Sequence, residues 1–107
     1  SPDVAVDITE TYDTKIQALH AHPSQFYEWL PWISGKLEEV PSKEADRLDW
    51  LKKLWPSTPN EKTRKLLERW YGNDKASHIQ QAEAFELCEY GHQPSEDEIR
   101  QLFPMIG

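Results

Sequence analysis

Prolines divide this chain into short segments. Eight of them are spread through the 107 residues, from Pro2 to Pro104. A proline lacks the amide hydrogen that an inner helical turn needs, and it biases the preceding residue away from helical backbone angles, so helices should end or bend at each one. Apolar spacing between these breaks predicts about five short helices, over residues 10–22, 26–35 with a kink at Pro31, 42–55, 59–71 and 95–103.

Capping residues predict where two of these helices begin. Thr58-Pro59-Asn60-Glu61 places a threonine at the N-cap, proline at the first helical position and glutamate three residues after the cap. Ser95-Glu96-Asp97-Glu98 repeats the capping box, and Gly72 is the expected left-handed terminator of the earlier helix. The helical faces expected to be buried are Ala45, Leu48, Leu51 and Trp55, then Leu66, Leu67, Trp70 and Tyr71, and last Ile99, Leu102 and Phe103.

Two segments are candidate strands. Val4, Val6 and Ile8 alternate with polar residues, which is typical of a half-buried strand. The run from Gln81 to Cys88 fits either a helix, because alanine and glutamate favour one, or a strand with two distinct faces; we take Ala82–Leu87 as the strand. Because a two-stranded sheet is marginal alone, helices have to cover it. We therefore expect a single α+β domain over residues 1–107 that is mostly α.

Charge and composition exclude several classes of function. Nineteen acidic residues against 12 basic ones leave a formal charge of −7, which argues against nucleic-acid binding. No apolar run approaches the roughly 20 residues that span a bilayer. A single cysteine excludes an intrachain disulfide, and the start at Ser1 has neither methionine nor an apolar leader. We expect a trimmed chain or a piece of a longer one, located in the cytoplasm.

Catalytic motifs are not evident in the residue spacing. His20 and His22 are the one close pair of metal-ligand types, but residues two apart on a helix point about 200° apart, so a zinc site with Cys88 is disfavoured and we assign no metal ligands. Ser24 lies outside any nucleophile elbow, and acidic neighbours keep Cys88 a thiol. We assign no catalytic residue. Five tryptophans at helical spacing are either core or a carbohydrate-stacking face, and we favour core: Trp29, Trp32, Trp50, Trp55 and Trp70.

Two stretches resemble a known family. Residues 6–25 contain Val6-Asp7-Ile8-Thr9 followed by Lys15, Ala18-Leu19 and His22-Pro23-Ser24-Gln25. This order resembles the C-terminal portion of the PIG-L/LmbE family of zinc-dependent N-deacetylases, in which a strand ending in Asp-Ile-Ser/Thr precedes a helix with a Lys-x-x-Ala-Leu-x-x-His-x-Ser-Gln pattern. Residues 72–90 contain Ala82-Glu83-Ala84-Phe85, which is similar to the family's Ala-Glu-Ala-Phe segment. The span between Phe26 and Tyr71 resembles no family that we can name.

The resemblance implies a parent enzyme with a Rossmann-like α/β domain that removes the N-acetyl group of an N-acetylglucosamine-type sugar. One zinc ion and an aspartate base act in such a parent, with zinc held by His-Pro-Asp-Asp and His-Pro-Asp-His motifs. Neither motif is present in these residues, and Ser24-Gln25 stand after His22-Pro23 where aspartates would be needed. The resemblance thus implies a C-terminal, non-catalytic part whose partner is the remainder of the parent chain.

The same resemblance implies candidate substrate-binding residues, His22 and Gln25, because such parts flank the sugar pocket. A structural alternative stays open: Ser24 and Gln25 cap a helix junction and His22 fills a gap. A second function also stays open, an acidic, tryptophan-rich helical module that binds a protein or glycan through Trp32, Trp50 or Trp55.

Overall fold

The computed structural model describes residues 1–106, and the chain falls into two compact units. The first, the sheet unit, combines residues 1–10 with residues 57–107; the second, the helical unit, is residues 11–56. Short helices and one two-stranded antiparallel sheet confirm the predicted fold class, α+β and mostly α. The single domain expected over residues 1–107 stays a prediction. It would be tested by following unfolding with several probes and asking whether their transitions coincide.

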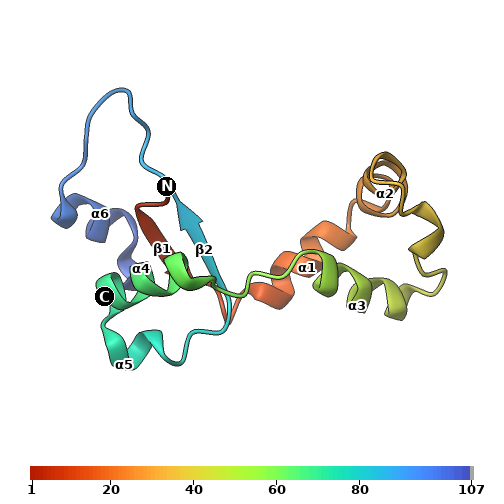
Figure 1. Ribbon diagram of the computed structural model, residues 1–107, viewed down its shortest axis with the longest axis horizontal. Helices are drawn as coiled ribbons and strands as arrows, with labels where there is room; N and C mark the ends of the chain where they lie inside the picture. The colour runs from red at the N-terminus through yellow and green to blue at the C-terminus, as the bar shows by residue number, and fades with distance from the viewer. Residues whose placement is uncertain (107) are drawn as a thin grey trace. The chain divides into compact units, whose positions relative to one another are not determined.

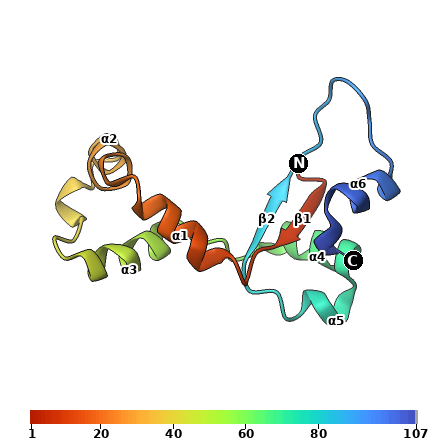
Figure 2. The same ribbon diagram turned by 180° about the vertical axis from the view of Figure 1, so that it is seen from behind.

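The sheet joins two segments from opposite ends of the sequence. Strand β1 (Val4–Asp7) pairs antiparallel with β2 (Ala82–Phe85), with Val4 opposite Phe85 and Asp7 opposite Ala82; Figure 1 and Figure 2 show the pair from front and back. The run after Gln81 is therefore a strand, because it completes the hydrogen bonds that β1 leaves open on one side. Both strands are shorter than predicted, since Ile8 and Leu87 lie beyond the paired residues.

Three α-helices and a short 3₁₀ turn complete the sheet unit. They are α4 (Glu61–Tyr71), α5 (Asn73–Ala76), α6 (Glu96–Leu102) and the turn Pro104–Ile106. Helix α6 begins with the predicted capping box: the Ser95 hydroxyl accepts from the Glu98 amide at 3.2 Å, and the Glu98 carboxylate accepts from the Ser95 amide at 3.2 Å.

Helix α4 begins two residues later than predicted. Its N-cap is Asn60, whose side-chain oxygen accepts from the Thr63 amide at 2.8 Å, so the assignment of Thr58 as the cap was wrong. Asparagine and threonine are both good caps, and the amide side chain of Asn60 is the one that reaches a free amide of the first turn. The predicted C-terminus is confirmed: α4 ends at Tyr71, and Gly72 has φ +88°, a backbone conformation that favours glycine.

The core of the sheet unit lies on both faces of β1. One cluster of buried side chains consists of Val4, Val6, Trp70, Ile99 and Ile106, and the other of Ala5, Leu67, Ala76, Ile79 and Ala82. Alternate strand residues point to opposite faces, so β1 contributes to both clusters. The Trp70 indole N–H donates to the Asp3 carbonyl at 3.0 Å, which satisfies its one polar atom. Leu102 was expected in this core, but its side chain is 70% exposed. Ile99 is the buried residue of α6.

The helical unit contains α1 (Tyr12–His20), a π-helix (Gln25–Trp29), α2 (Leu30–Ile33), a 3₁₀ turn (Leu37–Glu39) and α3 (Glu44–Leu54). The chain is helical from Gln25 to Ile33, and the helix type changes from π to α just before Pro31, so a kink at that residue stays a prediction. Helix α2 ends at Ile33, close to the predicted end near Gly35, where φ is +70°. Helix α1 packs on α3, and the Tyr12 hydroxyl lies 3.3 Å from the Lys52 carbonyl oxygen and 3.1 Å from that of Trp55.

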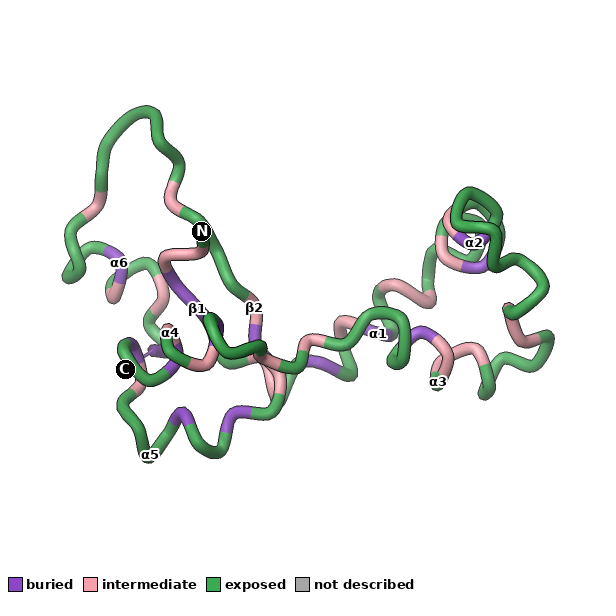
Figure 3. The backbone as a smooth tube through the Cα atoms, viewed as in Figure 1, coloured by how far each residue is buried: buried purple, intermediate pink, exposed green. Residues whose placement is uncertain are grey.

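Burial in the helical unit is sparse. Its buried apolar residues are Tyr12, Ile16, Tyr27, Pro31 and Leu51, and Figure 3 shows how short the purple stretches are along this part of the chain. The face predicted for α3 was partly wrong: Leu51 is buried and Leu48 half-buried, but Ala45 and Trp55 are exposed. Helix α3 packs on α1 and also reaches the π-helix, where Trp50 contacts the Tyr27 ring and Trp55 the Phe26 ring, yet Trp55 stays 44% exposed.

Candidate functional site

His22 and Gln25 lie at the turn between α1 and the π-helix. Both residues are exposed. The carbonyl oxygen of His22 accepts from the amides of Gln25 and Phe26, each at 3.2 Å, so the backbone of this turn is fixed while the side chains face solvent. His22 does not fill a gap in the core, and Ser24 stands at the N-cap position of the π-helix without a side-chain capping bond. An imidazole and a carboxamide presented in this way can both donate and accept hydrogen bonds.

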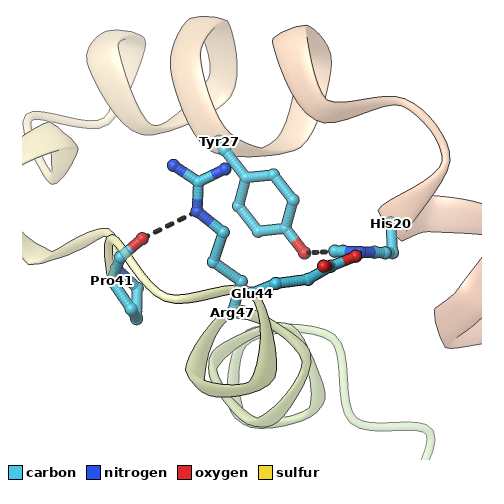
Figure 4. A network of polar contacts seen from close by, with 5 residues as sticks. All are labelled: His20, Tyr27, Pro41, Glu44 and Arg47. Carbon is cyan, nitrogen blue, oxygen red and sulfur yellow. Dashed lines mark hydrogen bonds and ion pairs between the residues drawn. The ribbon is translucent and has the colours of Figure 1, made fainter.

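A polar network next to this turn was missed by sequence reasoning. The Nδ1 atom of His20 lies 2.7 Å from the Tyr27 hydroxyl, and its Nε2 atom lies 2.9 Å from Glu44 Oε1 (Figure 4). An ionised carboxylate only accepts, so Nε2 carries a hydrogen; in the neutral imidazole Nδ1 then accepts and the Tyr27 hydroxyl donates. The network joins α1, the π-helix and α3.

Arg47 closes the network from α3. Its guanidinium lies 4.7 Å from the centre of the Tyr27 ring, and its Nε donates to the Pro41 carbonyl at 2.7 Å (Figure 4). Burial raises the pKa of Tyr27, Arg47 opposes this shift and Glu44 adds to it. The phenol therefore stays protonated as a donor at neutral pH.

These polar groups line an open pocket, but they are committed to one another. Both ring nitrogens of His20 have partners, and the Tyr27 hydroxyl and the Arg47 Nε are likewise engaged. A general base needs a free lone pair within reach of a substrate proton. The network therefore links α1, the π-helix and α3 next to the turn that carries His22 and Gln25, and it leaves no free imidazole nitrogen on His20.

A second pocket lies on the other side of the π-helix and α2. Its lining residues are Ser24, Glu28, Trp29, Trp32 and Leu37, and its volume is ≈ 500 Å³. Trp29 is 52% exposed and Trp32 is 67% exposed. Tyr27 and Pro31 are the buried residues of these two helices, whereas Glu28, Trp29 and Trp32 are exposed. We call this pocket the tryptophan groove.

The tryptophans divide between core and surface. Trp70 is buried and Trp50 half-buried, as a core assignment requires, but Trp29, Trp32 and Trp55 are exposed, which corrects that assignment for these three. Helical spacing alone places aromatic residues on one face, and it does not say whether another element packs on that face. No local sequence signal therefore distinguishes the exposed tryptophans from the buried one.

Metal-ligand side chains do not gather within residues 1–106. No group of three His, Cys, Asp or Glu side chains there is placed to hold an ion. His20 has both ring nitrogens engaged, one with Tyr27 and one with Glu44. In the same residues, no helix combines the length and apolar character that crossing a bilayer requires.

Comparisons with other proteins add no family to this description. Neither family models, nor curated proteins, nor solved structures gave a match to the chain. The resemblance to the PIG-L/LmbE deacetylases thus rests on the two sequence stretches that carry it and stays a prediction.

Proposed function

We propose that this chain is the C-terminal part of a zinc-dependent hydrolase that removes the N-acetyl group from an N-acetylglucosamine-type sugar. One observation carries the proposal. The two stretches that resemble the family, residues 6–25 and 72–90, are far apart in the sequence, yet they meet in the sheet: Val6 and Asp7, the last two residues of β1, pair with Glu83 and Ala82 of β2. Segments of one domain that are shared within a family are expected to lie together in this way.

Thr9 gives a physical reason for the Asp-Ile-Ser/Thr element of the resemblance. Its Oγ1 accepts from the amides of Gln80 and Gln81, at 3.1 and 3.2 Å, and its hydroxyl lies 2.6 Å from Asp7 Oδ1. A hydroxyl here therefore ties the first stretch to the residues just before β2. Serine or threonine meets this requirement, whereas an apolar residue would leave two amides without an acceptor.

His22 and Gln25 are the candidate substrate contacts in the complete enzyme. Both side chains are exposed on a turn whose backbone is fixed, and both can hydrogen-bond to sugar hydroxyls. Zinc and the aspartate base would come from the remainder of the parent chain, because His-Pro-Asp-Asp and His-Pro-Asp-His are absent from these 107 residues. We place this hydrolase in the cytoplasm.

The coding DNA upstream of Ser1 tests the proposal directly. We expect the reading frame to continue upstream and to encode His-Pro-Asp-Asp. A natural start codon immediately before Ser1 would overturn it.

In the complete enzyme, His22→Ala and Gln25→Ala should lower kcat/KM for deacetylation. Gln17 is an exposed residue of α1, so Gln17→Ala serves as the matched control and should leave kcat/KM unchanged.

A second candidate function is favoured by the exposed tryptophans. An acidic helical module that binds a protein or a glycan would use the surface around Trp32 and Trp55, which are 67% and 44% exposed. Replacement of either residue by alanine should remove binding to such a partner and leave the melting temperature nearly unchanged. Loss of folding in these variants would instead assign them to the core.

A further inference from the structure

We infer that a third pocket of the helical unit binds a small carboxylate that carries one aromatic ring. This pocket is distinct from the tryptophan groove and lies between α3 and the helical segments after Gln25; its volume is ≈ 160 Å³. We call it the ring pocket. The inference shares Trp55 with the second candidate function, but it rests on neither proposed function. Apolar walls, a small volume and one unpaired cation support it.

The walls of the ring pocket are almost entirely apolar. Four lining side chains are buried or half-buried: Phe26, Leu30, Pro31 and Trp50. Leu54 and Trp55 line its more exposed part, at 41% and 44% exposure. Small-molecule sites in proteins are typically concave and apolar, with a few polar groups that fix the orientation of the ligand. The ring pocket has this composition.

Ring contacts fix the aromatic walls. The rings of Phe26 and Trp55 meet edge to face, with centroids 5.7 Å apart and an interplanar angle of 82°. The Trp50 ring lies 6.1 Å from that of Tyr27, which is buried and bonded to His20. Because their own partners hold these rings, an aromatic ligand can add offset or edge-to-face contacts without first displacing them.

The volume and the polar groups limit the ligand to one ring. An apolar cavity of roughly 150 Å³ binds one benzene molecule, so a single six-membered ring fills a space of this size. The one hydroxyl of the lining, that of Ser34, already donates to the Leu30 carbonyl at 2.8 Å. A ligand with many hydroxyls would therefore recover few of the hydrogen bonds that it makes to water.

Lys36 supplies the charge. It is the one charged residue of the lining, and no acidic side chain accompanies it there. Its side chain is exposed and, within residues 1–106, has no ion pair or hydrogen bond. Its backbone amide donates to the Pro31 carbonyl at 2.7 Å, which anchors the lysine beside the apolar walls. An ammonium here attracts a carboxylate and repels another ammonium, so the pocket favours an anionic ligand.

Three ligands of nearly one shape measure this selectivity: 3-phenylpropanoate, its amide 3-phenylpropanamide, and 3-phenylpropylamine. Each is titrated into the chain, and the indole N–H signals in NMR report occupancy. We expect saturable binding of the carboxylate that shifts the signals of Trp50 and Trp55 and leaves that of Trp70 in place. The amide should bind about fivefold more weakly, which corresponds to the roughly 1 kcal/mol of a good exposed ion pair. The amine should bind most weakly.

Lys36→Met should abolish the preference for the carboxylate while leaving the affinity for the amide unchanged. Lys53→Met is the matched control, because it removes an exposed lysine of α3 that lines none of the pockets described for the helical unit. This control should bind all three ligands as the unchanged chain does.

Equal affinity for the three ligands would overturn the inference, as would a preference for the carboxylate that survives Lys36→Met. A titration in which neither the Trp50 nor the Trp55 signal shows saturable binding would also overturn it. None of these results bears on the deacetylase proposal, which is judged from the upstream coding sequence.

Discussion

The sheet unit and the helical unit stabilise themselves in different ways. Ten buried apolar side chains of the described residues belong to the sheet unit, whereas the helical unit buries only Tyr12, Ile16, Tyr27 and Leu51, in addition to Pro31. The helical unit relies instead on polar and aromatic contacts, such as those of Tyr12 and Tyr27, that join its short helices. It leaves six large apolar side chains on its surface, Trp29, Trp32, Ile33, Leu37, Leu54 and Trp55.

The two units also differ in net charge. The sheet unit carries twelve acidic and six basic side chains, so nearly all of the net charge of −7 belongs to it. The helical unit carries seven acidic and six basic side chains. The helical unit therefore combines a nearly neutral charge with exposed tryptophans, a combination that is typical of interaction surfaces.

The largest expected effect contrasts one tryptophan from each unit. Trp70→Ala removes a side chain that is 4% exposed, together with its hydrogen bond to Asp3, and should lower the free energy of unfolding by about 3–5 kcal/mol. Trp32→Ala removes one that is 67% exposed, and should change it by about 0.5 kcal/mol or less. Urea denaturation followed by circular dichroism measures both. Similar losses in the two variants would remove the contrast between the units.

Thr9 tests how firmly the two halves of the sheet unit are joined. Thr9→Val keeps the shape of the side chain but removes the acceptor of the Gln80 and Gln81 amides, so it should cost about 1–3 kcal/mol. Thr9→Ser retains the hydroxyl and should recover most of that loss. Urea midpoints at constant m-value provide the measurement. A serine variant as unstable as the valine variant would show that the methyl group, and not the hydroxyl, is what matters.

Tyr27 tests the corresponding polar contact of the helical unit. Tyr27→Phe keeps the buried ring and the Arg47 contact but leaves the Nδ1 atom of His20 without its donor, at a cost of about 1 kcal/mol. Thermal unfolding measures the stability, and the NMR shifts of the His20 ring report the lost bond. No change in those shifts would contradict the network shown in Figure 4.

The smallest effect concerns pH and the start of α6. A hydrogen bond from His92 at 2.8 Å, followed by the Ser95 amide, holds the pKa of Glu98 below its ordinary value in the folded chain. The carboxylate therefore contributes stability that is present above the unfolded-state pKa and is lost as the pH falls through the folded-state pKa. In an NMR titration, His92→Ala should move the pKa of Glu98 back towards its ordinary value. An unmoved titration would assign the shift to the helix cap alone.

Local features of the sequence predicted the elements well and the site only in part. Gly72 and Ser95 define helix ends through their own backbone and side chain, and both were predicted. Thr58 was a plausible cap, but Asn60 two residues later takes that role, and the pattern alone did not separate them. The exposed positions of His22 and Gln25 agree with a contact role without testing it, and the His20 network was missed because Glu44 lies 24 residues away.

By itself, the sequence determined the start of α6 and the end of α4, because capping side chains and glycines act on backbone groups within a few residues of themselves. Only the tertiary structure decided that residues 82–85 are a strand, because their hydrogen-bond partner is β1 at the other end of the sequence. The same holds for the tryptophans: whether Trp32 or Trp70 is buried depends on whether another element packs against its helix. That contact is made or absent between segments distant in sequence, and no local pattern records it.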